Sequence, residues 1–310
     1  MFAEKRNKMN SIHKTVLLNE TIDGLFTSKK VGNGKNLVVL DATFGGGGHS
    51  RLLCEKYPGI KIIALDQDQE TLNRAQDKFS GCNLVFSNAN FRNLDTVLSE
   101  KGIKAVDGII MDLGLSSDQL ENSGRGFSFL KNEPLLMTMK TNPTLQDLTA
   151  REIVNNWAEE NIATIIYGYG EERFSKRIAR GIVEARHDQK IETTFDLVKI
   201  IEQAVPGAYR RGRIHCATKT FQALRIAVND ELVALSEALK KGFKVLKMNG
   251  RMAVISFHSL EDRIIKRFYK NKEKEGEAKL INKKIITASA EEIKENPRAR
   301  SAKLRILSRL

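Results

Sequence analysis

The sequence predicts an α/β protein in which a mainly parallel sheet carries an inserted, all-helical domain. Short apolar runs that end in an acidic residue alternate with helical segments over residues 37–112. A stretch with helical periodicity and no strand-like run fills residues 144–205, and an apolar run returns at 252–257. Strands that alternate with helices favour right-handed βαβ units, which place the carboxyl ends of all the strands at one edge of the sheet.

Four strands are expected in the first part of the chain. An apolar run bounded by turn residues is typical of a strand that is buried in a parallel sheet. The expected strands are 37–41, 61–66, 83–87 and 106–112, and the helices expected between them are 49–57, 70–79 and 93–101. Ligands of such sheets bind beyond the carboxyl ends of the strands, so the acids at these ends are the first site candidates.

The pattern changes after residue 112. Residues 113–142 are polar and rich in Gly, Ser and Asn, and loops of this length are usually functional. The helical stretch that follows contains a capping-box sequence at Thr149 and stops at Pro206. We therefore expect one discontinuous domain from residues 1–118 and 215–310, interrupted by a helical, substrate-recognising insertion at 119–214.

The last part of the chain is expected to complete the sheet. A long amphipathic helix at 218–247 precedes the strand at 252–257, and a helix at 259–272 follows it. The two last strands, expected at 279–287 and 304–310, pair antiparallel at the sheet edge. The polar segment between them, 288–300, is expected to face solvent.

Composition is that of an ordinary globular protein. Of 310 residues 41% are hydrophobic, and no apolar run approaches the length of a membrane span. Residues 1–14 are charged and lack the apolar segment of a secretory signal. The three cysteines, Cys54, Cys82 and Cys216, show no CxxC spacing. We expect reduced thiols and a cytoplasmic location.

The charge of the chain favours a polyanionic partner. Its 51 Lys and Arg residues against 38 Asp and Glu residues give a net charge of +13, and such an excess attracts nucleic acid. Residues 261–310 hold 15 basic against 8 acidic residues, and residues 210–215 (RRGRIH) form a second dense cluster. For either cluster taken alone, a merely solvated face is the alternative.

Four glycines, Gly45–Gly48, join the first expected strand to its helix, where they allow positive φ and the close approach of a ligand. The third glycine of a dinucleotide pattern would fall on Ser50 or Arg51, and no Walker GK[ST] sequence is present. S-adenosylmethionine has no phosphate, and acids at strand ends such as Asp41 and Asp66 suit its ammonium and ribose hydroxyl groups. An ordinary turn is the alternative.

Several long stretches make the chain resemble one bacterial family, the ribosomal RNA small subunit methyltransferase H family. They occur in order over nearly the whole chain and are too long and specific to match by chance. The matching stretches are 13–20 (HKTVLLNE), 41–50 (DATFGGGGHS), 107–120 (DGIIMDLGLSSDQL), 125–129 (RGFSF), 169–180 (YGEERFSKRIAR), 220–232 (TFQALRIAVNDEL), 255–263 (ISFHSLEDR) and 296–301 (NPRARS).

The resemblance implies a Rossmann-like class I methyltransferase fold that uses S-adenosylmethionine. It also implies N4-methylation of a cytidine in the decoding region of 16S ribosomal RNA. Phe91 suits the adenine face, with a core Phe as the alternative. Within residues 66–68 one carboxylate is expected to face the ligand and the other to be solvated. The family's cofactor positions fall on Gly47, Gly48, His49, Asp66, Phe91, Asp112 and Gln119.

The chain departs from the family pattern at a few places. Asp118 and Cys216 each occupy a position at which the family usually has proline. Leu136 and Thr138 stand where the family usually has an Asp and an Arg. These departures bear on the contact with RNA more than on the cofactor site, and they leave open an altered efficiency or a shifted substrate.

The chemistry of amino methylation indicates where catalytic residues lie. The cytosine amino nitrogen is a poor nucleophile, so an enzyme must hold it in line with the methyl group and accept hydrogen bonds from it. Asp112, Ser116 and Ser117 follow the fourth strand at this place and are the catalytic candidates; a pure cofactor ligand is the alternative for Asp112. The motifs of C5-cytosine methylation and of zinc deamination are absent, and no metal site is predicted.

The expected partner is small-subunit ribosomal RNA or the 30S subunit, without a membrane. The expected RNA contacts are Arg210, Arg211, Arg213, His215 and His258. A capping or structural histidine is the alternative for His258. The sequence does not decide between a monomer and a homodimer. A non-catalytic RNA-binding protein, a small-molecule methyltransferase and an NAD-dependent enzyme remain as rivals.

Overall fold

The computed structural model describes residues 15–26, 34–141, 143–144 and 146–310, without the side chain of Ser117. The expectation for residues 1–14 lies outside these residues. A seven-stranded sheet has the order β3-β2-β1-β4-β5-β7-β6. Its first five strands are parallel, whereas β7 runs antiparallel to both β5 and β6. The strands are β1 (Val38–Asp41), β2 (Lys61–Asp66), β3 (Leu84–Asn88), β4 (Val106–Asp112), β5 (Leu246–Ser256), β6 (Ala278–Leu280) and β7 (Lys303–Arg309).

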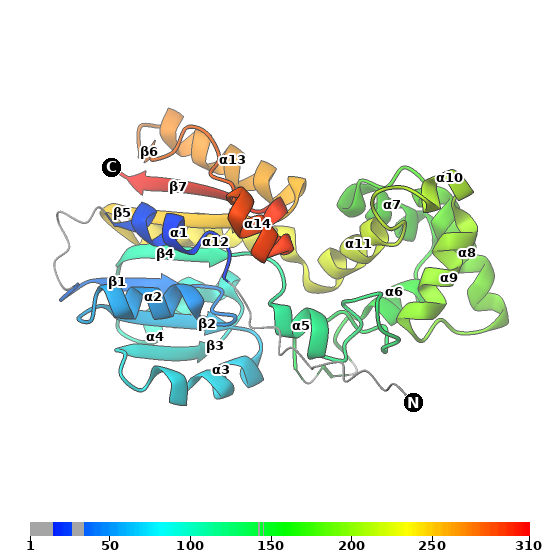
Figure 1. Cartoon of the computed structure of the whole chain (residues 1–310), viewed down its shortest axis with the longest axis horizontal. Helices are drawn as coiled ribbons and strands as arrows, with labels where there is room; N and C mark the ends of the chain where they lie inside the picture. Colours follow the sequence, from blue (N-terminus) through cyan, green and yellow to red (C-terminus); the bar gives the residue numbers. More distant parts are fainter. Residues whose placement is uncertain (1–14, 27–33, 142, 145) are drawn as a thin grey trace, which may run out of the picture.

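Helices cover both faces of this sheet, because the strands bury apolar side chains on both sides (Figure 1). One face packs against α4, α12 and α13, and the other packs against α1 and α2. The predicted Rossmann-like α/β fold is confirmed. The helices of this part are α1 (Leu18–Leu25), α2 (Gly48–Lys56), α3 (Gln69–Ala75), α4 (Leu94–Glu100), α12 (Glu231–Val245), α13 (Ser259–Lys274) and α14 (Ala290–Glu295).

A second lobe is made of helices and has a hydrophobic core of its own, formed by residues between Phe127 and Leu224 (Figure 1). Its core includes Phe221 and Leu224 of α11, which lie beyond the boundary expected at 214. The division into domains remains a prediction. The helices between β4 and α12 are α5 (Ser117–Asn122), α6 (Ala150–Asn156), α7 (Glu159–Gly170), α8 (Ser175–Asp188), α9 (Thr194–Ala204), α10 (Gly207–Arg210) and α11 (Thr218–Asn229).

The long helix expected at 218–247 is in fact two helices, α11 and α12. The chain turns between them at Asp230, which has φ +50°. Asn and Asp tolerate this left-handed conformation better than most residues. Tertiary contacts stabilise the turn. The side chain of Asn229 donates to the carbonyl of Met137 at 2.8 Å, and Asp230 pairs with Arg92 at 2.6 Å.

The end of the chain also differs from expectation. The strand expected at 279–287 ends at Leu280, because the side chain of Asn282 takes over hydrogen bonds to the backbone of β7. This side chain accepts from the N–H of Ile306 and donates to the carbonyl of Leu304. The segment expected to face solvent contains α14 and a 3-10 turn, η3 (Pro297–Ser301), in which Ala299 is fully buried.

The expectation of three reduced thiols is wrong for two of them. Cys54 of α2 and Cys82, which precedes β3, form a disulfide bond, and Cys216 is a buried free thiol. Spacing alone could not pair them, because the two cysteines lie 28 residues apart and meet only through the βαβ packing. Within the described part of the chain, no helix is both long enough and apolar enough to cross a membrane.

Candidate active site

A pocket opens at the carboxyl edge of the sheet. The space inside it, including the solvent at its open mouth, is about 1200 Å³. It is lined by the glycine loop, by the ends of β2 and β4, and by the 3-10 turn η2 (Phe91–Asn93). Met139 and Asn229 close it from the side of the helical lobe.

The glycine loop brings backbone to the wall of the pocket. Gly47 precedes α2 with φ +74°, and a Cβ on Gly48 would lie 1.7 Å from Thr15 Oγ1. Neither position accepts a side chain without displacing its neighbours. The glycines therefore let the loop pack closely against its neighbours, and the start of α2 at the pocket wall suits a carboxylate such as that of an amino-acid moiety.

Asp66 lies at the place expected for an acid that binds ribose. Its Oδ2 accepts from the N–H of Gly45 at 2.8 Å, and its Oδ1 accepts from the N–H of Asp68 at 2.9 Å. These bonds fix the carboxylate, and each oxygen keeps a second lone pair for a hydroxyl donor. Burial raises the pKa of Asp66 to about 6 against the hydrogen bonds that lower it, so a polar ligand that donates to the carboxylate would stabilise its charged form.

Two neighbouring acids differ from expectation. Asp68, expected to be solvated, is buried, caps α3 and pairs with Arg125 at 2.8 Å. Asp41 does not line the pocket. It pairs in register with Ala64 and Ile110, two positions before Asp66 and Asp112, so it lies deeper in the sheet. There it accepts from the hydroxyl of Ser50 at 2.6 Å, and burial raises its pKa to about 6.

Asp112 ends β4 at the pocket wall. Its backbone N–H donates to Thr43 Oγ1 at 2.6 Å, and its Oδ2 lies 3.9 Å from His49 Nδ1. Its Oδ1 is buried and has no hydrogen-bond partner among the described residues. Burial raises the pKa of Asp112 well above its ordinary value, and the negative charges of Asp41 and Glu261 raise it further. This oxygen is an acceptor without a donor in the described structure, on a residue that lines the pocket.

The other predicted cofactor residues also line this pocket. Phe91 begins η2, and His49 lies in the first turn of α2 and is almost completely buried. Gln119 and Ser116 form a capping box at the start of α5: Gln119 Oε1 accepts from the N–H of Ser116, and Ser116 Oγ accepts from the N–H of Gln119. Ser117 begins α5, and its side chain lies outside the described structure.

Comparison with known proteins assigns the chain to a family. The family model described as the MraW methylase family matches residues 10–310. The chain belongs to the MraW methylase family. This confirms the resemblance seen in the sequence, and S-adenosylmethionine is the methyl donor. The residues present fit this cofactor: the start of α2 at the glycine loop would suit its carboxylate, the fixed Asp66 would suit its hydroxyl groups, and the unpartnered oxygen of Asp112 would suit a cation.

Relatives match over almost their whole length. A ribosomal RNA small subunit methyltransferase H of Persephonella marina is 45% identical, over 90% of this chain and 94% of its own. A protein of the same name from Brevibacillus brevis is 42% identical, over 96% of this chain and 98% of its own. A solved structure of an rRNA methylase from Streptococcus thermophilus covers 88% of this chain and 87% of its own, with 12% identity and a TM-score of 0.41.

The methylase's predicted RNA contacts fall into two groups. Arg210, Arg211, Arg213 and His215 are exposed, around α10 at the outer side of the helical lobe (Figure 1). His258 instead caps α13: its Nδ1 accepts from the N–H of Glu261, and its Nε2 lies 3.3 Å from Glu261 Oε1. The structure thus gives His258 the capping role that the sequence left as an alternative, next to the pocket-lining residues Phe257 and Glu261.

The departures from the family pattern lie outside the cofactor pocket. Asp118 pairs with Arg74 at 2.6 Å on the outer side of α5. Thr138 is buried, and its hydroxyl accepts from the N–H of Lys140, whereas Leu136 is half-buried. The residue between them, Met137, has φ +54°. None of these three residues lines the pocket, and neither does Cys216, the fourth departure.

Part of the pocket wall is formed by residues that the sequence patterns did not predict. Thr15, Asn90, Asn229, Asn296 and Arg298 line it, although none was assigned to the site. Four of them lie in stretches that carry the family resemblance, 13–20, 220–232 and 296–301. Long matches without an assigned role were therefore the available signal. Thr15 and Arg298 come from opposite ends of the chain, so only the folded structure brings them to one wall.

Proposed function

We propose that this methylase transfers the methyl group of S-adenosylmethionine to the N4 amino group of one cytidine in the decoding region of 16S ribosomal RNA. The names of the relatives support ribosomal RNA of the small subunit as the substrate, since these proteins match over nearly their entire length. The net charge of +13 supports a polyanionic substrate. A single-stranded or flipped base is required for entry to a pocket of this kind.

One observation carries the choice of an amino group. Asp112 Oδ1 is buried at the pocket wall and lacks a hydrogen-bond partner within the described structure. A buried carboxylate oxygen without a donor is destabilising, and an N–H of an incoming amino group would satisfy it. A hydroxyl group offers one hydrogen-bond donor, and a ring carbon offers none. An amino group offers two N–H donors, and one of them remains after methylation.

In this proposal, some residues of the chain bind the methyl donor, and Asp112 accepts a hydrogen bond from the substrate. When bound, S-adenosylmethionine supplies an electrophilic methyl group, and its sulfur leaves with the electrons of the broken bond. The glycine loop, Asp66 and Phe91 would hold this donor. Asp112 would accept a hydrogen bond from the amino group, which directs the nitrogen lone pair toward the methyl carbon. As the new N–C bond forms, the amino proton passes to Asp112 and then to solvent, which balances the reaction.

The test uses small subunits from cells that lack the gene. Purified protein and methyl-labelled S-adenosylmethionine are incubated with these subunits and, separately, with free 16S RNA. We expect label in one cytidine, mapped by mass spectrometry to N4, and no label with D112N. Label on another nucleotide would correct the target, and label on small molecules alone would overturn the assignment. Cofactor binding without any transfer would support a non-catalytic assembly role.

A further inference from the structure

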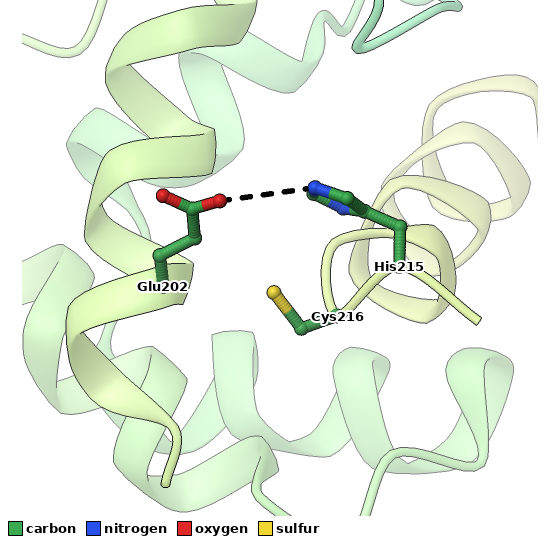
Figure 2. A group of neighbouring side chains, drawn as sticks. All are labelled: Glu202, His215 and Cys216. Atoms are coloured by element: carbon green, nitrogen blue, oxygen red, sulfur yellow. Dashed lines mark ion pairs between the residues drawn. The ribbon is translucent and has the colours of Figure 1, made fainter. Parts of the chain in front are cut away.

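We propose that Glu202, His215 and Cys216 form a binding site for one zinc ion at the base of the arginine-rich segment. Glu202 lies in the last turns of α9, and the other two residues directly precede α11. The carboxylate, imidazole and thiol groups converge on one space, as Figure 2 shows. One potential ligand atom from each residue lies within 4.8 Å of the others.

The distances fit an ion better than a direct contact. His215 Nε2 and Glu202 Oε1 are 3.8 Å apart, which is too long for a hydrogen bond. Zinc bonds of about 2.0–2.3 Å place tetrahedral ligands roughly 3.3–3.8 Å from one another. Glu202 is 43% and His215 41% exposed, so both side chains can close the remaining gap by rotation. Cys216 is buried beneath them and provides a fixed ligand.

The ligand types select the metal. A thiolate, an imidazole and a carboxylate are a mixed set that zinc accepts, whereas calcium and magnesium prefer oxygen ligands alone. Three protein ligands leave a fourth position for water. Binding replaces the thiol proton, which passes to solvent. It also moves the imidazole proton to Nδ1, so the 3.2 Å hydrogen bond that Nδ1 accepts from Ala217 is lost.

A second cluster of the same size does not carry this inference. Glu231, His258 and Glu261 also meet within 4.8 Å. There, however, both oxygens of Glu231 accept from the guanidinium of Arg225, at 2.8 and 2.9 Å. Glu261 accepts from the backbone N–H of Phe257 and lies against His258. These carboxylates already have partners, whereas Glu202 accepts no closer donor than the 3.8 Å imidazole in the described structure.

The place of the site indicates what the ion would do. It joins the end of α9 to the start of α11 and so closes the segment 203–214, which carries Arg210, Arg211 and Arg213. A zinc cross-link would hold these arginines in a fixed arrangement. This role in RNA binding rests on the proposed function, but the ion site itself does not.

The test measures metal binding rather than methylation. The C54S/C82S variant removes the other two cysteines, so any thiolate ligand in it must be Cys216. This protein is freed of metal and titrated with Zn²⁺ against a chromogenic chelator, and with Co²⁺ by absorption spectroscopy. We expect one ion per chain and a thiolate-to-cobalt charge-transfer band. Zinc should also raise the melting temperature, because it binds the folded state.

Variants separate this site from adventitious binding. Adding C216S should abolish the cobalt band, and E202Q should weaken zinc binding at least tenfold. H187Q, which changes an exposed histidine of the same lobe, should leave both unchanged. Circular dichroism checks that each variant is folded. Absence of zinc binding at micromolar free metal, or an unchanged cobalt band in folded C216S protein, would overturn the proposal.

Discussion

At the scale of single residues, a substitution of Asp112 distinguishes a catalytic role of its carboxylate from a role in binding the cofactor alone. We expect D112N to lower the rate of methyl transfer about 100-fold or more, because it removes the acceptor that orients the amino group and takes its proton. Affinity for the demethylated cofactor, measured by calorimetry, should change little. D118N, which alters an acid outside the pocket, is the control. A large loss of affinity at an unchanged rate would make Asp112 a cofactor ligand only.

The pH dependence of the rate follows from the same residue. Burial raises the pKa of Asp112 well above its ordinary value, and only the charged carboxylate accepts the proton. Activity should therefore fall as pH drops through this raised pKa. A cationic donor favours the charged carboxylate, so the kcat profile should lie at lower pH than the kcat/KM profile. In D112N this fall in the rate at low pH should be absent. The titration of Asp66, with a pKa of about 6, should persist as a change in cofactor affinity.

The glycine loop allows a steric test. In G48A the new Cβ would lie 1.7 Å from Thr15 Oγ1, so Thr15 must leave the pocket wall. Overpacking of this kind usually costs about 1–3 kcal/mol, and we expect cofactor affinity to fall about 10- to 100-fold. G81A is the matched control, since a Cβ on Gly81 meets nothing within 4 Å. Equal effects of the two changes on calorimetric affinity would exclude this steric account.

At the scale of elements, the disulfide between Cys54 and Cys82 ties α2 to the chain before β3. Cross-linking residues 28 apart removes conformational entropy from the unfolded chain, and the expected gain is about 3–4 kcal/mol. We expect C54S/C82S to lower the free energy of unfolding by this amount in urea titrations. Reductant should lower it equally in the wild type and leave the variant unchanged. A wild type that is insensitive to reductant would contradict the expectation.

Local patterns predicted the sheet well and the helix ends less well. Parallel strands are buried on both faces, so β1, β2 and β4 each contain an apolar run that the sequence alone reveals. The break at Asp230 was not predicted, because the amphipathic pattern runs through it. The contacts that stabilise the break come from Arg92 and Met137, far away in the chain.

The same limit applies to the site. The rule that ligands bind at strand ends found Asp66 and Asp112, which lie in register at the sheet edge. It also suggested Asp41, whose shorter strand ends two positions deeper. The wall formed by Thr15, Asn296 and Arg298 depends on how the ends of the chain pack against the sheet, and no local pattern contains that information.

At the scale of the whole molecule, a buried ion pair joins the two lobes. Arg125 Nη2 donates to Asp68 Oδ2 at 2.8 Å, and Arg125 Nη1 donates to the carbonyl of Met139. Asp68 also caps α3 of the sheet domain, while Met139 belongs to the core of the helical lobe. This ion pair therefore connects the sheet part, which carries the predicted cofactor residues Asp66 and Asp112, to the helical lobe, which carries the arginines predicted to contact RNA.

The salt dependence of RNA binding tests which basic surface contacts the substrate. Each phosphate contact to a single strand contributes about 0.7 to the slope of log affinity against log salt. If Arg210, Arg211 and Arg213 each bind a phosphate, replacing all three by alanine should lower this slope by about 2. The control is K279A/K283A/K284A, which removes the same charge from exposed positions near the last strands. Both variants carry the same net charge. If only the overall electrostatic attraction between protein and RNA mattered, the two variants would lose the same amount of slope. A larger loss in the lysine variant would move the RNA surface from the helical lobe to the sheet domain.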